Sequence, residues 1–461
     1  MKLMERTLSL ETLKLVGKKV KLCGWVDRRR DHGQLVFIDL KDRSGIVQIV
    51  GKKNLGDLRI SDVIEIEGLV RKRPEKLINP RLPTGCVEIG AEKIKILARS
   101  KDLPFDIHGD GREIGEETRL KYRYLDLRRP RLIQNLKLRD KYITHVREFL
   151  QSKDFVEIET PMLTKSTPEG SRDFIVPSRL QKGKFYALPQ SPQQYKQLLM
   201  VAGLERYFQI ARCLRDEDLR ADRGFEHTQI DLEMSFVQRE DVMNLIEELM
   251  IYCFEKMGKK IFQKPFPRFS QKEALKKFGA DKFDIRPKKD PNLMGFAWVI
   301  DFPVFEKDQD GNLTYSHNPF TAPREGEEKK LLLNKDLLNI TSQQYDLVLN
   351  GHEIGGGGIR IRDPKVLSKV FEVLGHTKEE IKQKFGHILE AFEYGVPPHG
   401  GIALGIDRHL MIICNEDAMR DVVAFPTTSS GQTSIMDAPS QVSPEQLKEL
   451  GLSINDKKKR K

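Results

Sequence analysis

Cysteine is scarce in this chain of 461 residues, and its five copies are far apart: Cys23, Cys86, Cys213, Cys253 and Cys414. The absence of paired spacing argues against a zinc site and a disulfide framework, and it favours a reducing compartment, so we expect a cytoplasmic protein. Long apolar runs are also missing. Met1-Lys2-Leu3 leads into no apolar segment and no stretch approaches the length of a membrane span, so we expect neither export nor membrane anchoring.

Negative charge is in deficit. The chain has 68 acidic against 79 basic residues, a net charge of +11 and an isoelectric point near 9.2. This balance favours a polyanionic partner such as nucleic acid, although a generic basic surface has the same composition. The length is sufficient for two or three domains.

Residues 215–226 concentrate three arginines and five carboxylates around a short turn. The flanking residues 207–213 and 229–236 have the pattern of strands, which predicts a charged hairpin. Such a hairpin suits an anionic ligand and its metal ions, because guanidinium groups fork onto phosphate oxygens. A solvated, salt-bridged hairpin is the alternative.

Residues 400–411 favour ligand binding. They predict a buried strand at 402–404, a turn at glycine, and a helix that begins near Asp407. Aspartate is a good N-cap, and Arg408 in the first helical turn can reach an anion at the start of the helix.

Residues 346–360 favour the same interpretation. A short apolar run at 347–349 predicts a buried strand, and Asp346 and Glu353 bracket it. Four glycines then allow the backbone to approach a ligand before Arg360. Two hard carboxylates beside an arginine suit Mg²⁺ together with a phosphate and a carboxylate ligand.

Taken together, these segments resemble the class II aminoacyl-tRNA synthetases. Residues 155–161, the charged hairpin and residues 400–411 are similar to motifs 1, 2 and 3 of that class. Four further segments resemble the bacterial-type aspartyl-tRNA synthetases in particular: 123–130, 167–174, 188–196 and 346–360. The similarity extends from about residue 24 to about residue 441.

Five short alternating segments between residues 16 and 98 predict a small closed barrel of the OB type. They are 20–26, 35–40, 46–50, 63–68 and 87–89. The predicted fold class is therefore α+β, with an OB-type β-barrel followed by the antiparallel-sheet catalytic domain and flanking helices of a class II synthetase.

Basic residues and an aromatic on one barrel face suit the stacking of unpaired bases above a guided backbone. A single phenylalanine in a strand is equally typical of the core. The resemblance places Arg30, Phe37 and Gln48 at the family's anticodon-binding positions. The expected anticodon contacts are Arg30, His32, Phe37, Gln48, Arg71, Arg73 and Lys76.

The predicted domains are an anticodon-binding domain at 1–105, a hinge at 106–134, a catalytic domain at 135–445 and a tail at 446–461 with a disordered basic end. Residues 136–153 have the apolar spacing of a helix. In the family this helix and the following strand at 155–161 build a homodimer interface, although a helix that packs on its own domain has the same pattern.

The resemblance implies ATP as a substrate. Arg215 would bind the α-phosphate, where charge develops as the amino acid attacks, and Arg408 would bind the γ-phosphate. Together with Glu353, these two arginines form the expected catalytic set. The expected ATP-binding residues are Arg215, Asp216, Glu217, His227, Glu353, Gly405, Ile406, Asp407 and Arg408. Mg²⁺ would be held by Asp346 and Glu353.

The resemblance also implies L-aspartate as a substrate. Arg360, fixed by a glycine loop, would form a bidentate pair with the side-chain carboxylate, and Lys196 would add a second positive charge. The expected aspartate-binding residues are Glu169, Gln193, Lys196, Arg215, Asp231, His317 and Arg360, with Asp231 and Glu169 as candidates for the ammonium group. A lone histidine such as His317 is more often structural, but the family match at 316–321 favours the site.

The chain departs from the family pattern at several positions. Gly224 replaces a glutamine and His227 replaces a phenylalanine that stacks on adenine; Gly358 and Asn318 stand where serine and histidine are common. An imidazole stacks less well and has a pH-dependent charge, which predicts weaker ATP affinity. Only residues 287–295 stand where bacterial-type enzymes insert a domain of roughly a hundred residues, so we expect the cost to fall on tRNA contacts.

Three other functions remain open. A non-discriminating enzyme would charge tRNA(Asp) and also tRNA(Asn); His32 favours this function and Lys76 favours strict selection. An ammonia-dependent aspartate ligase would have no use for the barrel. A catalytically dead RNA-binding paralogue would have no reason to retain six clustered charged residues, which are costly without a ligand.

Overall fold

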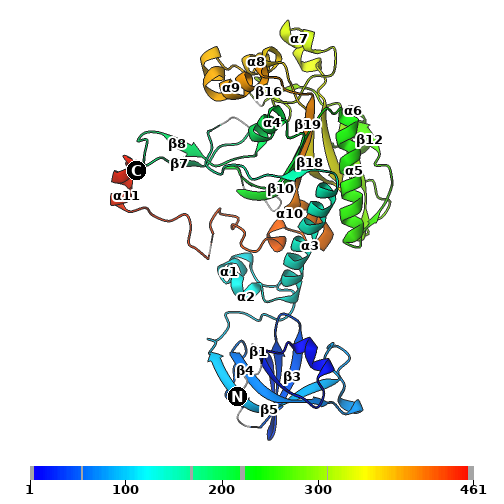
Figure 1. The fold of residues 1–461 in the computed structure, drawn as a ribbon, viewed down its shortest axis with the longest axis vertical. Helices are drawn as coiled ribbons and strands as arrows, with labels where there is room; N and C mark the ends of the chain where they lie inside the picture. Colours follow the sequence, from blue (N-terminus) through cyan, green and yellow to red (C-terminus); the bar gives the residue numbers. More distant parts are fainter. Residues whose placement is uncertain are drawn as a thin grey trace. The chain divides into compact units, whose positions relative to one another are not determined.

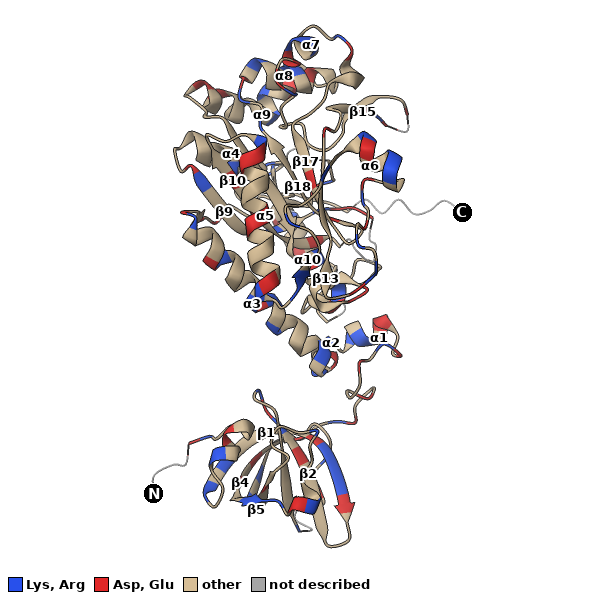
Figure 2. Ribbon diagram, turned by 90° about the vertical axis from the view of Figure 1, so that its right-hand side faces the viewer, with Lys and Arg blue, Asp and Glu red and all other residues tan. Residues whose placement is uncertain are grey.

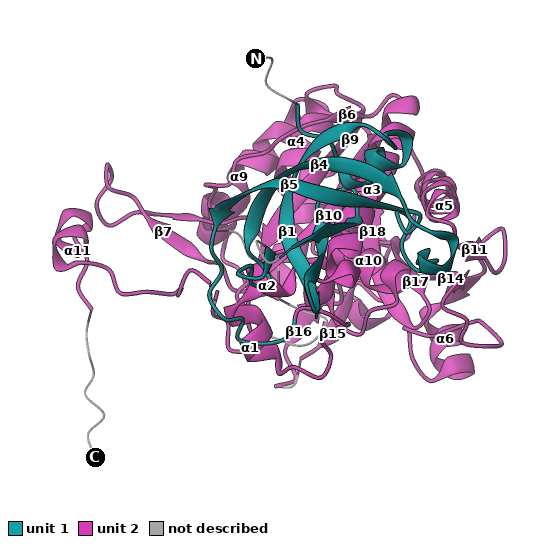
Figure 3. Ribbon diagram, turned by 90° about the horizontal axis from the view of Figure 1, so that it is seen from below, with its two compact units in different colours: residues 1–106 teal, residues 107–461 magenta. Residues whose placement is uncertain are grey.

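The computed structural model describes residues 5–52, 55–166, 170–218, 224–308, 310–433 and 435–454. It divides into two compact units, Met1–Asp106 and Ile107–Lys461 (Figure 3). The segment predicted as a hinge, 106–134, belongs to unit 2 from Ile107 onward, and its role as a hinge stays a prediction.

Unit 1 is a closed five-stranded barrel with the strand order β1-β2-β3-β5-β4 (Figure 1). Its strands are β1 (Lys19–His32), β2 (Leu35–Lys41), β3 (Ile46–Gly51), β4 (Val63–Lys72) and β5 (Val87–Ala98), with short 3₁₀ turns η1 (Ser9–Lys14) and η3 (Glu75–Leu77). All five predicted strands are confirmed, and each is longer than its apolar pattern. Alternate residues such as Leu22, Ile38, Ile49 and Ile66 fill the interior with no exposed surface.

Unit 2 is built on an eight-stranded sheet with the order β12-β14-β17-β18-β19-β10-β9-β6. The strands are β6 (Val156–Glu157), β9 (Arg206–Leu214), β10 (Glu226–Ser235), β12 (Arg268–Ser270), β14 (Phe296–Ile300), β17 (Gln344–Leu349), β18 (His352–Ile359) and β19 (His399–Gly405). The inner pairs are antiparallel, and β6 and β12 add to the edges in parallel. The predicted α+β class is confirmed.

Three small two-stranded sheets complete the strands of unit 2: β7 (Ile175–Pro177) with β8 (Phe185–Ala187), β11 (Lys260–Ile261) with β13 (Leu293–Met294), and β15 (Phe305–Lys307) with β16 (Leu313–Tyr315). The helices are α1 (Glu116–Lys121), α2 (Arg123–Asp126), α3 (Pro130–Ser152), α4 (Gln193–Val201), α5 (Arg239–Lys256), α6 (Gln271–Phe278), α7 (Glu328–Leu332), α8 (Pro364–Val373), α9 (Lys378–Glu393), α10 (Ile406–Cys414) and α11 (Pro444–Leu450). Short 3₁₀ turns, η4 (Leu337–Asn339) and η5 (Met419–Val422), follow α7 and α10.

The helix predicted at 136–153 is confirmed as α3, which begins earlier because Pro130 occupies its first turn, where the missing N–H costs nothing. Charged residues of both signs lie along α3 and α5 (Figure 2). The buried sides of α3, α5 and α10 pack on one face of the sheet in a single apolar core. The opposite face of the sheet is therefore available for polar side chains.

Two local predictions were wrong. The strand expected at 155–161 is only Val156–Glu157. The four glycines at 355–358 do not form a loop: they lie in β18, paired with β17 on one side and β19 on the other. A Cβ on Gly357 would come within 2.1 Å of the Gly401 carbonyl oxygen, so the central strand has room for no side chain at this position.

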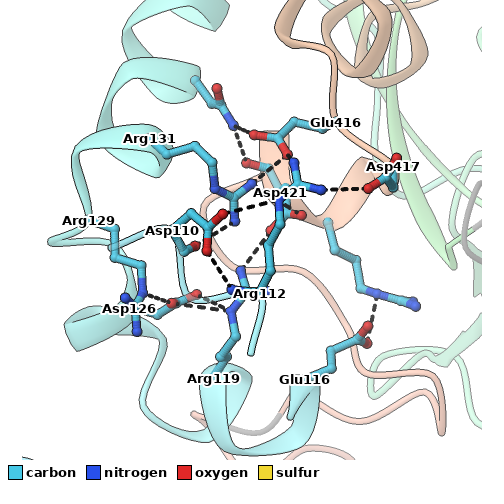
Figure 4. Close-up of polar contacts among 12 residues, drawn as sticks. Asp110, Arg112, Glu116, Arg119, Asp126, Arg129, Arg131, Glu416, Asp417 and Asp421 are labelled. Atoms are coloured by element: carbon cyan, nitrogen blue, oxygen red, sulfur yellow. Dashed lines mark hydrogen bonds and ion pairs between the residues drawn. The ribbon is translucent and has the colours of Figure 1, made fainter. Parts of the chain in front are cut away.

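A cluster of ion pairs fixes the start of unit 2 to the segment after α10 (Figure 4). Glu416 accepts hydrogen bonds from Arg131, from Arg112 at 3.1 Å and from Asn135 at 2.7 Å. Nearby, buried Asp126 accepts hydrogen bonds from the side chains of Arg119, Arg123 and Arg129. The Glu416 bonds join residues nearly 300 positions apart in the chain, whereas the Asp126 bonds are local, so Glu416 ties the start of unit 2 to the segment after α10.

Candidate active site

A cavity of about 430 Å³ lies on the polar face of the unit 2 sheet, beside α4 and the start of α10. It brings together most of the predicted catalytic-unit residues: Gln193, Lys196, Arg215, Glu217, His227, Asp231, His317, Asp346, Glu353, Arg360, Gly405, Asp407 and Arg408. Asp216 and Ile406 do not line it. Ile406 is wholly buried in the core, and the Asp216 backbone pairs with Arg172. Glu169 lies outside the described residues.

Strand alternation explains why the cavity is polar. In β10, Ile230, Leu232 and Met234 belong to the core, and Gln229, Asp231 and Glu233 have the opposite orientation because successive side chains point to opposite faces. The charged hairpin predicted between β9 and β10 is confirmed by the pairing of Leu214 with Glu226. Its tip, residues 219–223, lies outside the described residues.

Three buried charged residues, Lys196, Asp231 and Arg360, line the floor of the cavity, and both cations also pair with buried Glu233, which does not itself line the cavity. Lys196 Nζ lies 3.0 Å from Asp231 Oδ2 and 3.3 Å from Glu233 Oε2. Arg360 makes a bidentate pair with Glu233, with Nε 2.8 Å from Oε1 and Nη2 3.1 Å from Oε2. The guanidinium fork that the sequence assigned to a substrate carboxylate is therefore occupied by Glu233.

Glu233 is a residue that the sequence interpretation missed. Its position in the sequence could have identified it, because Gln229, Asp231 and Glu233 occupy alternate positions of one strand and therefore lie on the same face of the sheet. Burial opposes the charge of Glu233, but Arg360 and Lys196 outweigh it and hold the pKa of Glu233 below its usual value. Burial raises the pKa of Asp231, and the attraction of Lys196 only partly offsets that rise. This cluster therefore contains one firmly ionised carboxylate and one that is easier to protonate.

Asp346 and Glu353 lie on adjoining strands and both line the cavity. Asp346 accepts from Gln344 Nε2 at 2.7 Å and lies 3.0 Å from His317 Nε2. Glu353 lies 2.8 Å from Lys282 Nζ. Neither Gln344 nor Lys282 was predicted, and no motif in the sequence distinguishes them.

The pKa values at this carboxylate pair have clear causes. Burial raises the pKa of Asp346 despite His317, and the neighbouring Glu353 raises it further. Burial also opposes the charge of His317, but Asp346 and Glu353 prevail and hold the pKa of His317 above its usual value. The described residues include no group of three His, Cys, Asp or Glu suited to a metal ion. Two adjacent carboxylates that repel each other still suit Mg²⁺, which takes one or two carboxylates and completes its shell with phosphate and water.

Two arginines, Arg215 and Arg408, line the cavity near His227. Arg215 Nε is buried and has no hydrogen-bond partner among the described residues. The side chain of Arg408 is fixed by a hydrogen bond from Nη1 to the Glu353 carbonyl. Glu217 accepts a hydrogen bond from Ser171 Oγ. The guanidinium groups are thus placed where an anion would compensate them.

His227 lines the cavity beside these two arginines. Burial, followed by the positive charges of Arg215, Arg212 and Arg408, lowers the pKa of His227 to about 3. A pH-dependent charge near neutrality is therefore not expected: the imidazole is neutral first because it is buried and second because three nearby guanidinium groups oppose its protonation.

Asp407 does not cap α10. The N-cap residue is Gly405, and Asp407 lies in the first helical turn. Its carboxylate accepts from Arg139 Nη1 at 2.5 Å and from the Thr228 backbone N–H at 3.0 Å. Asp407 therefore connects α10 to α3 and β10 next to Arg408.

In unit 1, the cross-strand pairs Arg30 with Phe37 and Asp39 with Gln48 share one face of the barrel. Phe37 is half-buried there, between the core residues Val36 and Ile38, and contacts His32 edge-on. Arg30 donates to Asp39 at 2.7 Å, and Gln48 donates to Glu88 at 3.1 Å.

Arg71 and Lys76 are exposed, but Arg73 is only 5% exposed. Its guanidinium donates to the carbonyls of Leu77 and Gly85 and lies 3.5 Å from Glu88. The prediction that Arg73 presents its charge on the barrel surface was therefore wrong, because its own loop and strand bind that charge.

An OB-type barrel followed by an antiparallel sheet with this charged cavity defines the class II aminoacyl-tRNA synthetases. Residues 115–429 match the family model of tRNA synthetases class II (D, K and N), and residues 20–97 match that of the OB-fold nucleic acid binding domain. The chain belongs to the class II D, K and N tRNA synthetase family.

Curated relatives match nearly the whole chain. The chain is 42% identical to the aspartate–tRNA(Asp/Asn) ligase of Moorella thermoacetica over 96% of this chain and 95% of the relative. It is 41% identical to the protein of the same name from Dictyoglomus turgidum over 96% of each chain. The first comparison spans 575 positions, more than the 461 residues present here, so the relative has stretches with no counterpart in this chain.

Solved structures share the fold. An aspartyl-tRNA synthetase described as putative from Leishmania major Friedlin is 20% identical, with a TM-score of 0.72 over 92% of this chain and 94% of that chain. The asparaginyl-tRNA synthetase of Pyrococcus horikoshii, complexed with asparaginyl-adenylate, is 22% identical, with a TM-score of 0.73 over 92% of this chain and 99% of that chain.

Two expectations from composition can also be compared with the structure. None of the five cysteines forms a disulfide. Within the part of the chain that the structure describes, no helix combines the length and apolar character needed to cross a bilayer.

Proposed function

We propose that this chain is an aspartate–tRNA ligase, which uses ATP to activate L-aspartate and transfers the aspartyl group to the 3′ end of tRNA(Asp). The observation that carries the proposal is the buried cluster of Lys196, Asp231, Glu233 and Arg360. A zwitterion with a second carboxylate complements such a cluster, because it offers both signs of charge. The names of the curated relatives support the same activity.

In this proposal Lys196 and Arg360 attract the side-chain carboxylate of aspartate. Asparagine, which is neutral at that end, would leave the two cations without a ligand charge, and this difference gives strong discrimination. Arg360 keeps its fork on Glu233 and acts on the substrate as an oriented positive charge. Asp231 and Gln193 receive the ammonium group, and His317 lines the cavity beside Asp346.

ATP would occupy the part of the cavity near Arg215 and Arg408. Arg215, whose Nε has no hydrogen-bond partner among the described residues, would stabilise the charge that develops at the α-phosphate as the aspartate carboxylate attacks and pyrophosphate leaves. Arg408, fixed by the Glu353 carbonyl, holds the terminal phosphate. Asp346 and Glu353 would hold Mg²⁺, which supplies charge neutralisation for the phosphates when bound. The ribose 3′-hydroxyl of the tRNA then takes the aspartyl group from the adenylate.

Further parts of the proposal concern the tRNA and the assembly. The barrel face with Arg30, Phe37 and Gln48 would stack the anticodon bases, with His32, Arg71 and Lys76 at its borders. The helix at 136–153, which lies in α3, and residues 155–161 would form a homodimer interface, and the protein would act in the cytoplasm. We place the missing insertion at 287–295, a short segment that includes β13.

A non-discriminating activity on tRNA(Asn) is the second candidate. The printed names of the relatives, aspartate–tRNA(Asp/Asn) ligase, favour it, as does His32 beside Phe37. Its partners would be tRNA(Asp) and tRNA(Asn), and its product on tRNA(Asn) would need a later amidation.

The test is to charge unmodified tRNA(Asp) and tRNA(Asn) transcripts separately with labelled aspartate, ATP and Mg²⁺. Label on tRNA(Asp) alone supports a discriminating ligase, and label on both supports the second candidate. Label on neither, together with no aspartate-dependent ATP–pyrophosphate exchange, would reject the ligase. As a matched control, asparagine should give no exchange.

A further inference from the structure

A chain of buried hydrogen bonds extends from the cavity to the backbone behind it. Gln193 Nε2 donates to Gln197 Oε1 at 3.1 Å, and Gln197 Nε2 lies 3.1 Å from His399 Nε2. His399 Nδ1 lies 2.8 Å from the Pro397 carbonyl oxygen. Gln193 lines the cavity, whereas Gln197 and His399 do not.

The Pro397 carbonyl fixes which group donates and which accepts in each of these three hydrogen bonds. A carbonyl oxygen can only accept, so His399 Nδ1 must carry the proton that it shares with Pro397. In the neutral imidazole, Nε2 is then an acceptor and takes the N–H of Gln197. Gln197 has its oxygen left for Gln193, which donates one of its two amide N–H groups to that oxygen. The amide oxygen of Gln193 takes no part in these bonds and is the acceptor that remains for the cavity.

Burial makes this direction robust. Gln197 and His399 have no exposed surface, and Gln193 is only 4% exposed, so water cannot replace a mismatched bond. Burial, helped by Arg360 and Lys196 against the pull of Glu233, lowers the pKa of His399, which keeps the ring neutral. The two glutamines are four residues apart on α4, so they face the same way along one side of that helix.

We infer that Gln197 and His399 are positioning residues that set the polarity of the Gln193 amide, so that its oxygen faces the substrate and accepts from the ammonium group. The inference rests on the proposed function for the identity of the ammonium group. Neither residue touches the substrate. If the Gln193 amide turned round, its NH₂ would face a positive charge, which converts an attraction into a repulsion.

The test compares L-aspartate with succinate, which has both carboxylates but lacks the ammonium group. In ATP–pyrophosphate exchange with the full chain, the quantity to measure is the inhibition constant of succinate divided by the KM for aspartate. Gln197→Met removes the amide at nearly constant volume, and we expect this ratio to fall about tenfold, as one charge-assisted hydrogen bond is lost. The KM for ATP should stay within about twofold of wild type.

Gln197→Glu is the conservative rescue. One carboxylate oxygen still accepts the Gln193 N–H, and the other faces His399 Nε2, which must then take up a proton and donate it. The Gln193 amide keeps its direction, so the ratio should stay within about twofold of wild type. Gln343→Met is the matched control, because its amide donates at 3.1 Å to the Pro323 carbonyl and does not line the cavity. If Gln197→Met weakened aspartate and succinate equally, the residue would be merely structural and the inference would be overturned.

A second measurement is independent of activity. Nitrogen NMR of histidine-labelled protein, with His399→Gln to assign the signal, should show His399 protonated at Nδ1; a proton at Nε2 would overturn the inference. Different measurements test the ligase activity and the positioning role. Absence of aspartate-dependent exchange in the wild type rejects the ligase, whereas normal exchange with an unchanged ratio in Gln197→Met rejects the positioning role.

Discussion

His227 stands in the proposed nucleotide site, at a position where the related synthetases have a phenylalanine. It lines the cavity beside Arg215, and burial together with nearby guanidinium groups lowers the pKa of its imidazole to about 3. A neutral imidazole stacks on a purine with a smaller surface than a phenyl ring. The consequence for affinity therefore follows from ring size, since the ring has no charge near neutral pH.

We expect His227→Phe to tighten the Kd for ATP by about two- to tenfold, the range of a better aromatic contact. Isothermal titration calorimetry at pH 6.5 and 8 should give the same gain at both values, because His227 does not titrate in that interval. His376→Phe, whose ring packs on Phe371 away from the cavity, is the control. An ATP Kd that is unchanged by His227→Phe would contradict the stacking role.

Buried histidines also make the fold sensitive to acid. His409 lies 2.6 Å from the Tyr142 hydroxyl, and burial, followed by the charge of Arg408, lowers the pKa of His409 to about 3. Below its ordinary pKa of about 6.5, the unfolded chain takes up a proton that the folded chain does not. The free energy of unfolding should therefore fall as pH decreases from 6.5 toward 3, by roughly 1.4 kcal/mol per pH unit for each such group.

Denaturant unfolding of wild type and His409→Gln at pH 7.5 and 5.5 checks this expectation. The substitution should reduce the loss of stability between the two pH values by roughly 1 kcal/mol, even if it lowers stability at both. An equal loss in wild type and His409→Gln would show that this group does not contribute.

At the scale of elements, β18 is unusual because four of its residues are glycines in the middle of a sheet. Atoms of the neighbouring strands β19 and β17 occupy the positions where side chains of β18 would lie. A Cβ on Gly355 would come within 2.6 Å of Ala403 O, and one on Gly356 within 2.7 Å of Asp346 Oδ1. The glycines thus leave room for the carboxylate of Asp346 and for the close approach of β19.

Gly357→Ala should destabilise unit 2 by at least about 3 kcal/mol or abolish soluble expression, because the new Cβ would lie 2.1 Å and 2.8 Å from backbone atoms of Gly401 and Ile402. Gly386→Ala is the matched control. It lies inside α9 with its nearest neighbour at 3.7 Å, so it should be neutral or add up to about 1 kcal/mol. Thermal unfolding measures both; a stable Gly357→Ala protein would contradict the packing argument.

The ion-pair cluster at the entry to unit 2 offers a second comparison, between two adjacent carboxylates. The side chain of Glu416 is 1% exposed and is bound by Arg112, Arg131 and Asn135, whereas that of Asp417 is 88% exposed and is bound by Arg112. Removing one partner of a buried pair leaves the other charges uncompensated, but a surface pair contributes little.

Glu416→Gln should therefore lower the stability of unit 2 by about 3 kcal/mol and increase proteolytic cleavage near residues 107–131. Asp417→Asn should change stability by less than about 1 kcal/mol. Thermal unfolding and limited proteolysis of the two variants decide the matter. Equal effects would show that the cluster does not hold this segment in place.

At the scale of the whole molecule, each unit has an apolar core of its own. We expect calorimetry to resolve two unfolding transitions. Ile49→Ala should lower only one transition and Leu347→Ala only the other, each by about 2–5 kcal/mol, because both side chains are fully buried in separate cores. If each substitution moved both transitions together, the units would unfold as one.

Much of this architecture was predictable because its signals are local. The five barrel strands, α3 and the hairpin of β9 and β10 follow from alternation, helical spacing and a charged turn, which depend on neighbours in the chain. Most members of the cavity were also predictable, through the resemblance of short motifs. The errors at 355–358 and at Asp407 share one cause, which is that each local pattern is compatible with several structures. A glycine run can form a loop or a strand, and here pairing with β17 and β19 makes it a strand. An aspartate near the start of a helix can cap it or bind another element, and here Asp407 binds Arg139 of α3.

Apolar periodicity predicted the barrel and the α+β class, and motif spacing predicted the family and most charged residues of the cavity, because both signals are present in the chain before it folds. How those charges pair depends on the folded molecule. Arg360 meets Glu233 across 127 positions of the chain, Arg73 turns into its own loop, and His227 lies among three guanidinium groups. These partners depend on distance and burial in the folded chain, and neither quantity is encoded in local order.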